Sequence, residues 1–275
     1  MACLKGKKHM NIIRCNLFPG GRTHCLTMSY DDGPQEDARL TEIFRKYGIR
    51  GTFHINSRNL QLHIPENVTE FHKRYDGFEV ACHTLSHPFP TMQNSGVALF
   101  EIEEDRRMLE RTCGYPVRGM SYPFGDFDER TIAIFRSAGM EYSRTTRSTN
   151  GYGMPENFMK WHPTCHHNGG IVEKWDDFIA PDRWGNSRLF YIWGHSFEFP
   201  HNDNWSMMEE FCKKAGGRDD VWYAENIEIV DYQNAVMGLR FSLELTSVQN
   251  PSATDVWFTC NGEKVCCPAG KMISL

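Results

Sequence analysis

Hydrophobic and polar positions alternate along the chain in blocks that predict strands and helices in turn. The run "CLTMSYDD" has the apolar character of a buried strand, and "IRGTFHIN" predicts a second one. Between them, apolar residues at i, i+3, i+4 and i+7 predict an amphipathic helix, with Gly48 as its cap and one face formed by Leu40, Ile43, Phe44 and Tyr47. A strand–helix–strand unit of about 30 residues predicts that the two strands are parallel.

The same alternation continues to about residue 236. Further strands are predicted in "GFEVACH", "VRGMSYPFG", "MEYSRTT", "FMKWHPT" and "RLFYIWGH". Further helices are predicted at 96–113, in "DERTIAIFRSAG" and in "SMMEEFCKKAG", and "AENIEIVDYQNAV" is typical of a strand plus a helix. Seven or eight short strands with helices between most of them predict an α/β fold, a distorted (β/α)7-8 barrel of parallel strands over residues 10–236. From residue 237 onward, polar and apolar residues alternate between turn signals, which predicts a small antiparallel β appendage at 237–275.

Composition and charge narrow the function classes. The 275 residues suffice for a large core, and a net charge of −5 provides no broad basic surface, so no nucleic-acid partner is expected. No apolar run reaches membrane-spanning length. The basic N-terminal segment lacks a following apolar region, so we expect no signal peptide and a cytoplasmic location, although a chain that had lost its signal peptide would look the same. Ten scattered cysteines without a CxxC pair predict reduced thiols, and the sequence gives no indication of oligomeric state.

Polar side chains gather where the predicted strands end. They are Asp31 and Asp32 after the first strand, His83 and His87 after "FEVAC", Phe124 after "RGMSY", and His195 after "LFYIWG". In a parallel barrel the carboxyl ends of the strands carry the active site, because the strand-to-helix loops converge there. The sequence therefore predicts one site that contains all of these residues.

Two of these features have a chemical logic of their own. Adjacent carboxylates repel, so the pKa of either Asp31 or Asp32 is expected to rise, although Asp-Gly and Gly-Pro are also common turn dipeptides. His83 and His87 stand at i and i+4 and share a face on a helical turn, while Pro88 disfavours a helix there. Two histidines and one carboxylate would leave open positions on a metal ion for water and substrate, which is typical of a catalytic metal site.

The motifs resemble those of a known family. "SYDDG", "HTLSH", "SYPFG" and "IWGH" resemble, in order and spacing over roughly residues 25–200, the motifs of the polysaccharide deacetylases, the NodB-homology group of carbohydrate esterase family 4. The resemblance implies a NodB-like barrel and a divalent metal ion, usually zinc in this family. The implied metal ligands are Asp32, His83 and His87.

The same resemblance implies roles for the other residues. Asp31 would be the general base, His195 the general acid, and the backbone N–H of Phe124 a donor to the oxyanion. These roles match what amide hydrolysis requires, namely a metal-activated water, a base, an acid for the leaving amine, and donors for the developing negative charge. The implied function is removal of an N-acetyl or O-acetyl group from a carbohydrate, so the expected partner is an acetylated carbohydrate.

The sequence also departs from the family pattern. Ser121 replaces the arginine of the third motif, and Arg118 is the candidate to take its place. The fourth motif, an aspartate near a tryptophan, has two candidate locations, "KWHPTCHH" and "EKWDDF". Tyr122 and Trp193, and with them Trp161, are candidates for stacking on a sugar face, although aromatic residues at strand ends are as often part of the core.

The roles of several residues stay open, and so do two alternative functions. His166 and His167 are either pocket-rim residues or surface-loop residues, and Cys165 with His166 lacks the partner cysteines of a second metal site. Glu198 either tunes His195 or is a loop carboxylate, and the loop interpretation is favoured. Four other histidines are interpreted as structural or exposed: His24, His54, His63 and His72. The alternative functions are hydrolysis of a non-sugar C–N bond on the same barrel, and carbohydrate binding by a pseudoenzyme.

Overall fold

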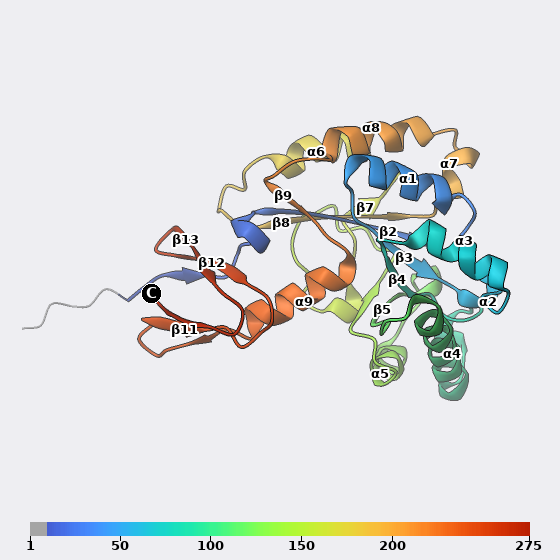
Figure 1. Cartoon of the computed structure of the whole chain (residues 1–275), viewed down its shortest axis with the longest axis horizontal. Coiled ribbons are helices and arrows are strands. Elements are labelled where there is room, and N and C mark those ends of the chain that lie inside the picture. The colour runs from blue at the N-terminus through green and yellow to red at the C-terminus, as the bar shows by residue number, and fades with distance from the viewer. Residues whose placement is uncertain (1–9) are drawn as a thin grey trace, which may run out of the picture. The chain divides into compact units, whose positions relative to one another are not determined.

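The computed structural model of the chain describes residues 10–275, which form two compact units (Figure 1). The larger unit contains His24–Pro181 and Arg188–Val230. The smaller unit contains Asp231–Leu275 and also takes in residues 10–23 and Asp182–Ser187. Residues 1–9, where part of the segment considered for a signal peptide lies, are outside the described residues.

The larger unit is built on one parallel sheet. Seven strands follow one another in the order β6 (Tyr142–Arg144), β5 (Gly119–Ser121), β4 (Glu79–Cys82), β3 (Thr52–Ile55), β2 (His24–Asp31), β8 (Arg188–Gly194) and β7 (Cys165–His166). An eighth strand, β9 (Val221–Tyr223), also pairs with β2. The central strand β2 is buried along its whole length, as expected for a parallel strand covered on both faces. The carboxyl ends of β2, β4, β5 and β8 therefore meet at one rim.

An irregular segment joins the two edges of this sheet. Trp161 forms a parallel bridge with Arg144 of β6, and four residues later Cys165 pairs with Ile192 of β8. The prediction of a distorted barrel of parallel strands is thus confirmed. The predicted strand "FMKWHPT" is wrong in its first half, because Phe158–Lys160 is a 3-10 turn in which the side chain of Asn157 accepts the backbone N–H of Met159.

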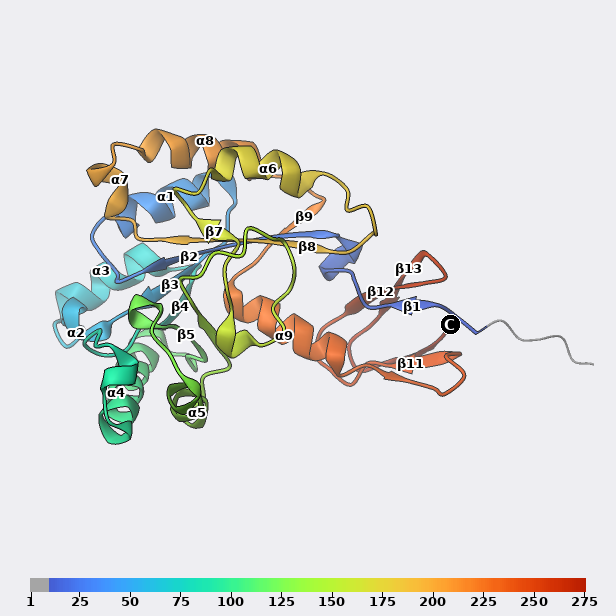
Figure 2. The ribbon, with the colours of Figure 1, turned by 180° about the vertical axis from the view of Figure 1, so that it is seen from behind.

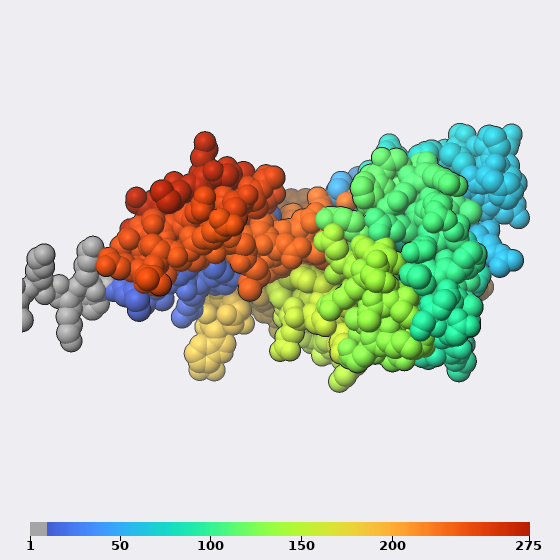
Figure 3. All heavy atoms as spheres, turned by 90° about the horizontal axis from the view of Figure 1, so that it is seen from below, coloured from blue at the N-terminus to red at the C-terminus, as the bar shows by residue number. Residues whose placement is uncertain are grey.

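Helices cover both sides of the sheet. One side carries α1 (Asp37–Tyr47), α6 (Ile171–Ile179) and α8 (Trp205–Ala215), which pack against one another at the top of Figures 1 and 2. On the other side α4 (Ser95–Cys113) and α5 (Glu129–Ser137) lie next to each other, and Figure 3 shows their outer faces side by side. The remaining helices are α2 (Ser57–Leu60), α3 (Pro65–Tyr75), α7 (Glu198–His201) and α9 (Asn226–Met237), and none of the described helices is both long and apolar enough to cross a membrane.

The smaller unit contains two antiparallel three-stranded sheets. One is formed by β1 (Ile13–Arg14), β12 (Val256–Cys260) and β13 (Glu263–Cys267), and the other by β10 (Arg240–Phe241), β11 (Ser247–Gln249) and β14 (Met272–Ser274). Its core contains Val248, Phe258 and Cys267. All cysteines within residues 10–275 are free thiols.

A buried carboxyl lies at the start of β4. Glu79 accepts hydrogen bonds from Thr52 Oγ1 at 2.7 Å, Tyr142 Oη at 2.8 Å and the Ile227 backbone N–H at 3.0 Å. Burial is the largest influence and, despite these donors, raises the pKa of Glu79 from 4.5 to about 7. The folded state therefore holds a proton there that the unfolded chain releases between these two pH values.

This group predicts a pH-dependent stability. Between pH 4.5 and about 7 the unfolded state binds fewer protons at Glu79, so its contribution to the unfolding free energy falls as pH rises, by at most about 1.4 kcal/mol per pH unit. Glu79→Gln removes this contribution. Urea unfolding at pH 5, 6 and 7 is expected to show the wild type losing stability relative to Glu79→Gln, and parallel curves would contradict the raised pKa.

Candidate active site

The two adjacent carboxylates reach the same site because the backbone turns between them. Asp31 is the last residue of β2, and Asp32 adopts a left-handed conformation with φ of 76°, followed by Gly33 with φ of 69°. In a regular strand neighbouring side chains point to opposite faces. The turn cancels this alternation, and Asp is one of the residues that tolerate a positive φ. The turn and the candidate site are therefore the same feature.

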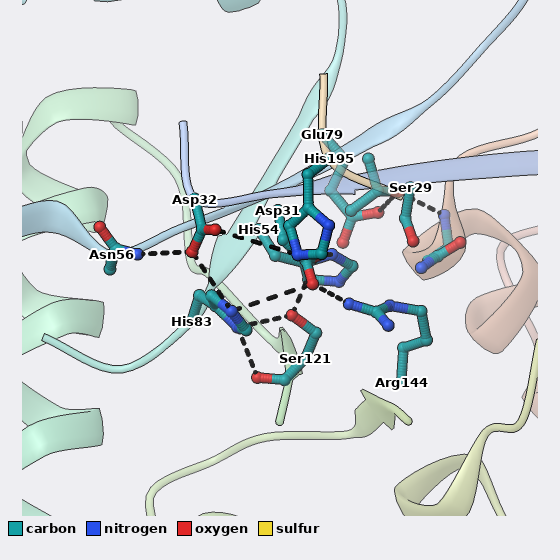
Figure 4. Close-up of polar contacts among 12 residues, drawn as sticks. Ser29, Asp31, Asp32, His54, Asn56, Glu79, His83, Ser121, Arg144 and His195 are labelled. Carbon is teal, nitrogen blue, oxygen red and sulfur yellow. Dashed lines mark hydrogen bonds and ion pairs between the residues drawn. The ribbon is translucent and has the colours of Figure 1, made fainter. Parts of the chain in front are cut away.

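Asp31 lies at the centre of a buried group of polar side chains (Figure 4). Arg144 contacts its Oδ2, His54 Nδ1 lies 3.2 Å from its Oδ1, and Ser121 donates to Oδ1 at 3.2 Å. Burial alone would raise the pKa of this carboxyl, but Arg144, then His83 and His54, hold the pKa of Asp31 well below its usual range. Asp31 is therefore ionised at neutral pH.

Arg144 was not among the residues predicted for the site. It is the last residue of β6, is fully buried, and is the register partner of Ser121 on β5. Its guanidinium carbon lies 4.3 Å from the ring centroid of Trp193. Arg118, which was proposed to fill this place, precedes β5 and pairs with Glu141 at 3.2 Å instead. A guanidinium thus reaches Asp31 from the strand that pairs with β5, next to the small Ser121.

Asp32, His83 and His87 are brought together with the atoms that a metal needs. Their ligand atoms lie within 4.8 Å of one another, and Oδ1 of Asp32 is 3.6 Å from His83 Nε2 and 3.7 Å from His87 Nε2. His83 Nδ1 lies 2.9 Å from the carbonyl of Ser121, which accepts its proton and leaves Nε2 as a free lone pair. Burial, the largest influence, lowers the pKa of His83 to about 3, which keeps the imidazole neutral. The donor set therefore fits a divalent cation such as zinc.

The histidine loop is anchored by helix α4. Asp105 accepts the backbone N–H groups of His83 at 2.9 Å and Ser57 at 2.8 Å. Glu101 accepts the backbone N–H and the hydroxyl of Ser86, at 2.8 and 2.7 Å. His87 has a φ of 57°, so the two histidines sit in a loop rather than on a helix. Pro88, which follows, disfavours a helix at this position, as the sequence indicates.

His195 faces the two carboxylates from the end of β8. Its Nε2 lies 3.9 Å from Oδ2 of Asp32, and its Nδ1 lies 2.8 Å from Oε1 of Glu198. Burial disfavours the protonated ring, but the hydrogen bond to Glu198 and the charges of Asp31 and Asp32 outweigh it and raise the pKa of His195. The prediction that Glu198 is merely a loop carboxylate is therefore wrong.

Glu198 contacts two more histidines. Its Oε2 lies 3.1 Å from Nε2 of both His166 and His167. Burial opposes its ionisation, yet these imidazoles and His195 hold the pKa of Glu198 well below its usual range. "KWHPTCHH" thus contributes His166 and His167 beside the site, whereas "EKWDDF" lies on α6.

The acidic pair of "EKWDDF" lies on the outside of α6. Asp176 pairs with Lys214 at 2.8 Å, and Asp177 pairs with Arg188 at 3.3 Å. Both aspartates are mostly exposed, with 70% and 71% of their side-chain surface accessible. The carboxylate beside His195 is therefore Glu198, which stands only three residues after it in the sequence.

The aromatic candidates differ in their exposure. Phe124 has a φ of 60°, is 53% exposed, and stacks on Phe89 with ring centroids 3.8 Å apart. Trp193 is 8% exposed and lies beside His195. Tyr122 is buried and donates its hydroxyl to the carbonyl of Met159, and Trp161 is also buried in the core. Of these aromatic residues, Phe124 and Phe89 present the largest exposed faces.

Comparison with known proteins agrees with the motifs. The sequence model of the family described as Polysaccharide deacetylase matches residues 20–143. Chitin deacetylase 1 of Cryptococcus neoformans is 29% identical over 126 residues, which is 45% of this chain and 26% of that protein. The peptidoglycan-N-acetylmuramic acid deacetylase PdaC of Bacillus subtilis is 26% identical over 106 residues, which is 38% of this chain. The chain thus spans only about a quarter of the length of these two relatives, 26% and 22%.

Solved structures share the fold. The Xyl-CE4 domain of a multidomain xylanase from the hindgut metagenome of Trinervitermes trinervoides gives a TM-score of 0.54 at 14% identity, covering 77% of this chain and 92% of that one. A CE4-family pseudoenzyme from Bacillus anthracis gives 0.51 at 17% identity, covering 76% and 66%. At these identities the likeness establishes the architecture, which is the NodB-like barrel predicted from the sequence.

Proposed function

We propose that this chain, which carries the polysaccharide deacetylase match at residues 20–143, is a metal-dependent hydrolase that removes N-acetyl or O-acetyl groups from a carbohydrate. The observation that carries the proposal is the convergence of an ionised Asp31, a three-residue ligand set and His195 at one rim of the barrel. The names of the relatives, which act on chitin and peptidoglycan, support a carbohydrate substrate.

The ligand set defines where a cation would be held. Asp32, His83 and His87 supply one carboxylate oxygen and two imidazole nitrogens, which suit zinc. When bound, a divalent cation would supply Lewis-acid chemistry, making water nucleophilic at neutral pH and polarising the acyl carbonyl. The neutral state of His83 keeps its lone pair available for this role.

The remaining residues divide the proton transfers between them. Asp31, held ionised by Arg144, accepts the proton of the attacking water. His195 directs Nε2 toward the site, while its Nδ1 is fixed by Glu198, so that it delivers a proton to the departing group. The backbone N–H of Phe124 donates to the acyl oxygen as negative charge develops there.

The experiment that tests the proposal combines metal content with turnover. The full chain is freed of metal with a chelator, reloaded with zinc, and assayed for acetate release from N-acetylated chito-oligosaccharides. Zinc-dependent release supports the proposal. Zinc binding with hydrolysis of cyclic amides alone would point to the non-sugar C–N hydrolase, and zinc and glycan binding without turnover on any acetylated glycan would point to a pseudoenzyme. Failure to bind metal at Asp32, His83 and His87 would overturn the mechanism.

A substitution of Glu198 tests the proposed role of His195 as the general acid. Glu198→Gln keeps the size of the side chain but removes the charge that orients His195 through Nδ1. We expect kcat to fall about 10- to 100-fold with little change in KM, because the substrate is bound but the leaving group is protonated poorly.

The control for this variant is Glu209→Gln. Glu209 pairs with Lys46 at 2.5 Å on an exposed part of α8, where an ion pair contributes little. This substitution is expected to leave both kinetic constants unchanged. If Glu198→Gln raised KM with kcat intact, Glu198 would act on substrate binding rather than through His195.

A further inference from the structure

A second group of metal-ligating side chains lies beside the candidate active site. His166 ends β7, His167 follows it, and Glu198 begins α7. The Nε2 atoms of both histidines lie 3.1 Å from Oε2 of Glu198, and the three ligand atoms are within 4.8 Å of one another. Tetrahedral zinc with ligand distances of 2.0–2.2 Å separates its ligands by roughly 3.3 Å. The spacing from Glu198 to each histidine is therefore already close to that of a zinc site.

His167 is held rigidly in the orientation that such a site needs. Its ring is fully buried and stacks between Tyr30 and Phe199, with centroid distances of 5.8 and 4.4 Å. A side chain at Gly194 would place its Cβ 2.0 Å from His167 Nδ1, so only glycine leaves room for the ring. Neither ring nitrogen has a well-formed hydrogen bond, and Nε2 is the one aimed at Glu198. A buried ring that its neighbours hold in place, with Nε2 directed at the Glu198 carboxylate, is preorganised for a ligand shared with that carboxylate.

His166 completes the set from a more accessible position. Its ring packs edge-on against Trp193 with centroids 4.9 Å apart, and a quarter of its side-chain surface is exposed. The backbone N–H of Asn168 lies 3.3 Å from His166 Nδ1. This long hydrogen bond is lost when the ring proton moves to Nδ1. The lone pair of Nε2 is then free to bind a cation.

A cation has a route to this group from solvent. A surface cavity of about 310 Å³ is lined by His167, Asn168, Asn204 and two acidic residues, Glu173 and Glu210. Carboxylates that line a cavity raise the local concentration of cations. The cavity reaches His167, and the side chains of His166 and Glu198 are themselves 25% and 22% exposed, so a cation can approach this group from solvent.

We infer that His166, His167 and Glu198 form a second divalent-cation site, of the zinc class, whose occupation inhibits turnover. The two oxygens of Glu198 divide the interactions, since Oε2 faces the two histidines and Oε1 accepts from His195 Nδ1. A dipositive ion on Oε2 draws charge from the carboxylate and weakens the hydrogen bond that orients His195. Binding at this site is independent of the proposed function, whereas the inhibition rests on it.

Zinc stoichiometry separates the two sites. Zinc alone is titrated into the metal-free full chain, and bound zinc is counted after equilibrium dialysis. We expect two ions per wild-type chain, one in His83→Ala, one in His166→Gln and one in Glu198→Gln. His201→Ala, which removes an exposed histidine of α7, is the matched control and is expected to keep two. Two ions retained in both His166→Gln and Glu198→Gln would overturn the second site.

Measurements of turnover then test whether occupation of the second site inhibits the enzyme. Wild-type activity is expected to rise with the first equivalent of zinc and to fall about tenfold as the second site fills, while His166→Gln loses this fall. A wild type that binds two ions without inhibition would overturn the inhibitory role. If His83→Ala keeps two ions while His166→Gln loses one, the second site stands and the proposed catalytic site fails, so the two failures are distinguishable.

Discussion

Asp31→Asn is expected to abolish most turnover while the chain still binds zinc. The substitution keeps the size of the side chain but removes the ionised carboxylate that Arg144 and His54 hold in place. Loss of a general base typically lowers kcat about 10²- to 10⁴-fold. Because Asp32, His83 and His87 form the ligand set, metal content is expected to stay at the wild-type level. Acetate release and zinc content of the same preparation are the measurements.

Two companion variants assign the roles within the pair. His83→Ala is expected to lose both the ion at this ligand set and the activity, because it removes a ligand. Asp32→Asn is expected to weaken zinc binding for the same reason. If Asp31→Asn released the metal and Asp32→Asn kept it, the roles of the two carboxylates would be reversed. The left-handed turn at Asp32 makes this a real alternative, since both side chains reach one site.

Much of the fold was predictable because its signals are local. A buried parallel strand gives a continuous apolar run, as in β2, and an amphipathic helix gives regular spacing, as in α1 with its left-handed Gly48 cap. Helix α3 was missed because only Phe71 and Tyr75 are buried on it. Helix α6 does carry a usable signal, since Ile171, Trp175 and Phe178 are buried at i, i+4 and i+7.

The site was predictable only where its residues follow one another in motifs. Asp31, Asp32, His83, His87 and His195 are brought together as the motifs indicated. Arg144 was not predicted as a site residue. It lies beside Ser121 because β5 pairs with β6, and spacing along the chain does not reveal that pairing. A charged residue at the carboxyl end of a buried strand was the available signal, and "EYSRTT" contains it.

Arg144→Met is expected to lower the unfolding free energy of the metal-free chain by about 3–5 kcal/mol at neutral pH. Arg144 and Asp31 are both buried and in contact, so removal of the guanidinium leaves a carboxylate without its cation in the core of the barrel. Methionine fills much of the same space beside Trp193, so little of the loss comes from a cavity. Urea unfolding of the chelated protein measures the change.

The double variant Asp31→Asn with Arg144→Met separates charge from packing. If the cost arises from an unpaired carboxylate, neutralising Asp31 restores at least half of the stability that Arg144→Met loses, and the two substitutions are strongly non-additive. Arg118→Met is the matched control, because Arg118 forms a partly exposed pair with Glu141 and is expected to cost no more than about 1 kcal/mol. Additive losses in the double variant would mean that Arg144 stabilises the barrel through packing, and Asp31 would then depend on His54 and Ser121 for its position.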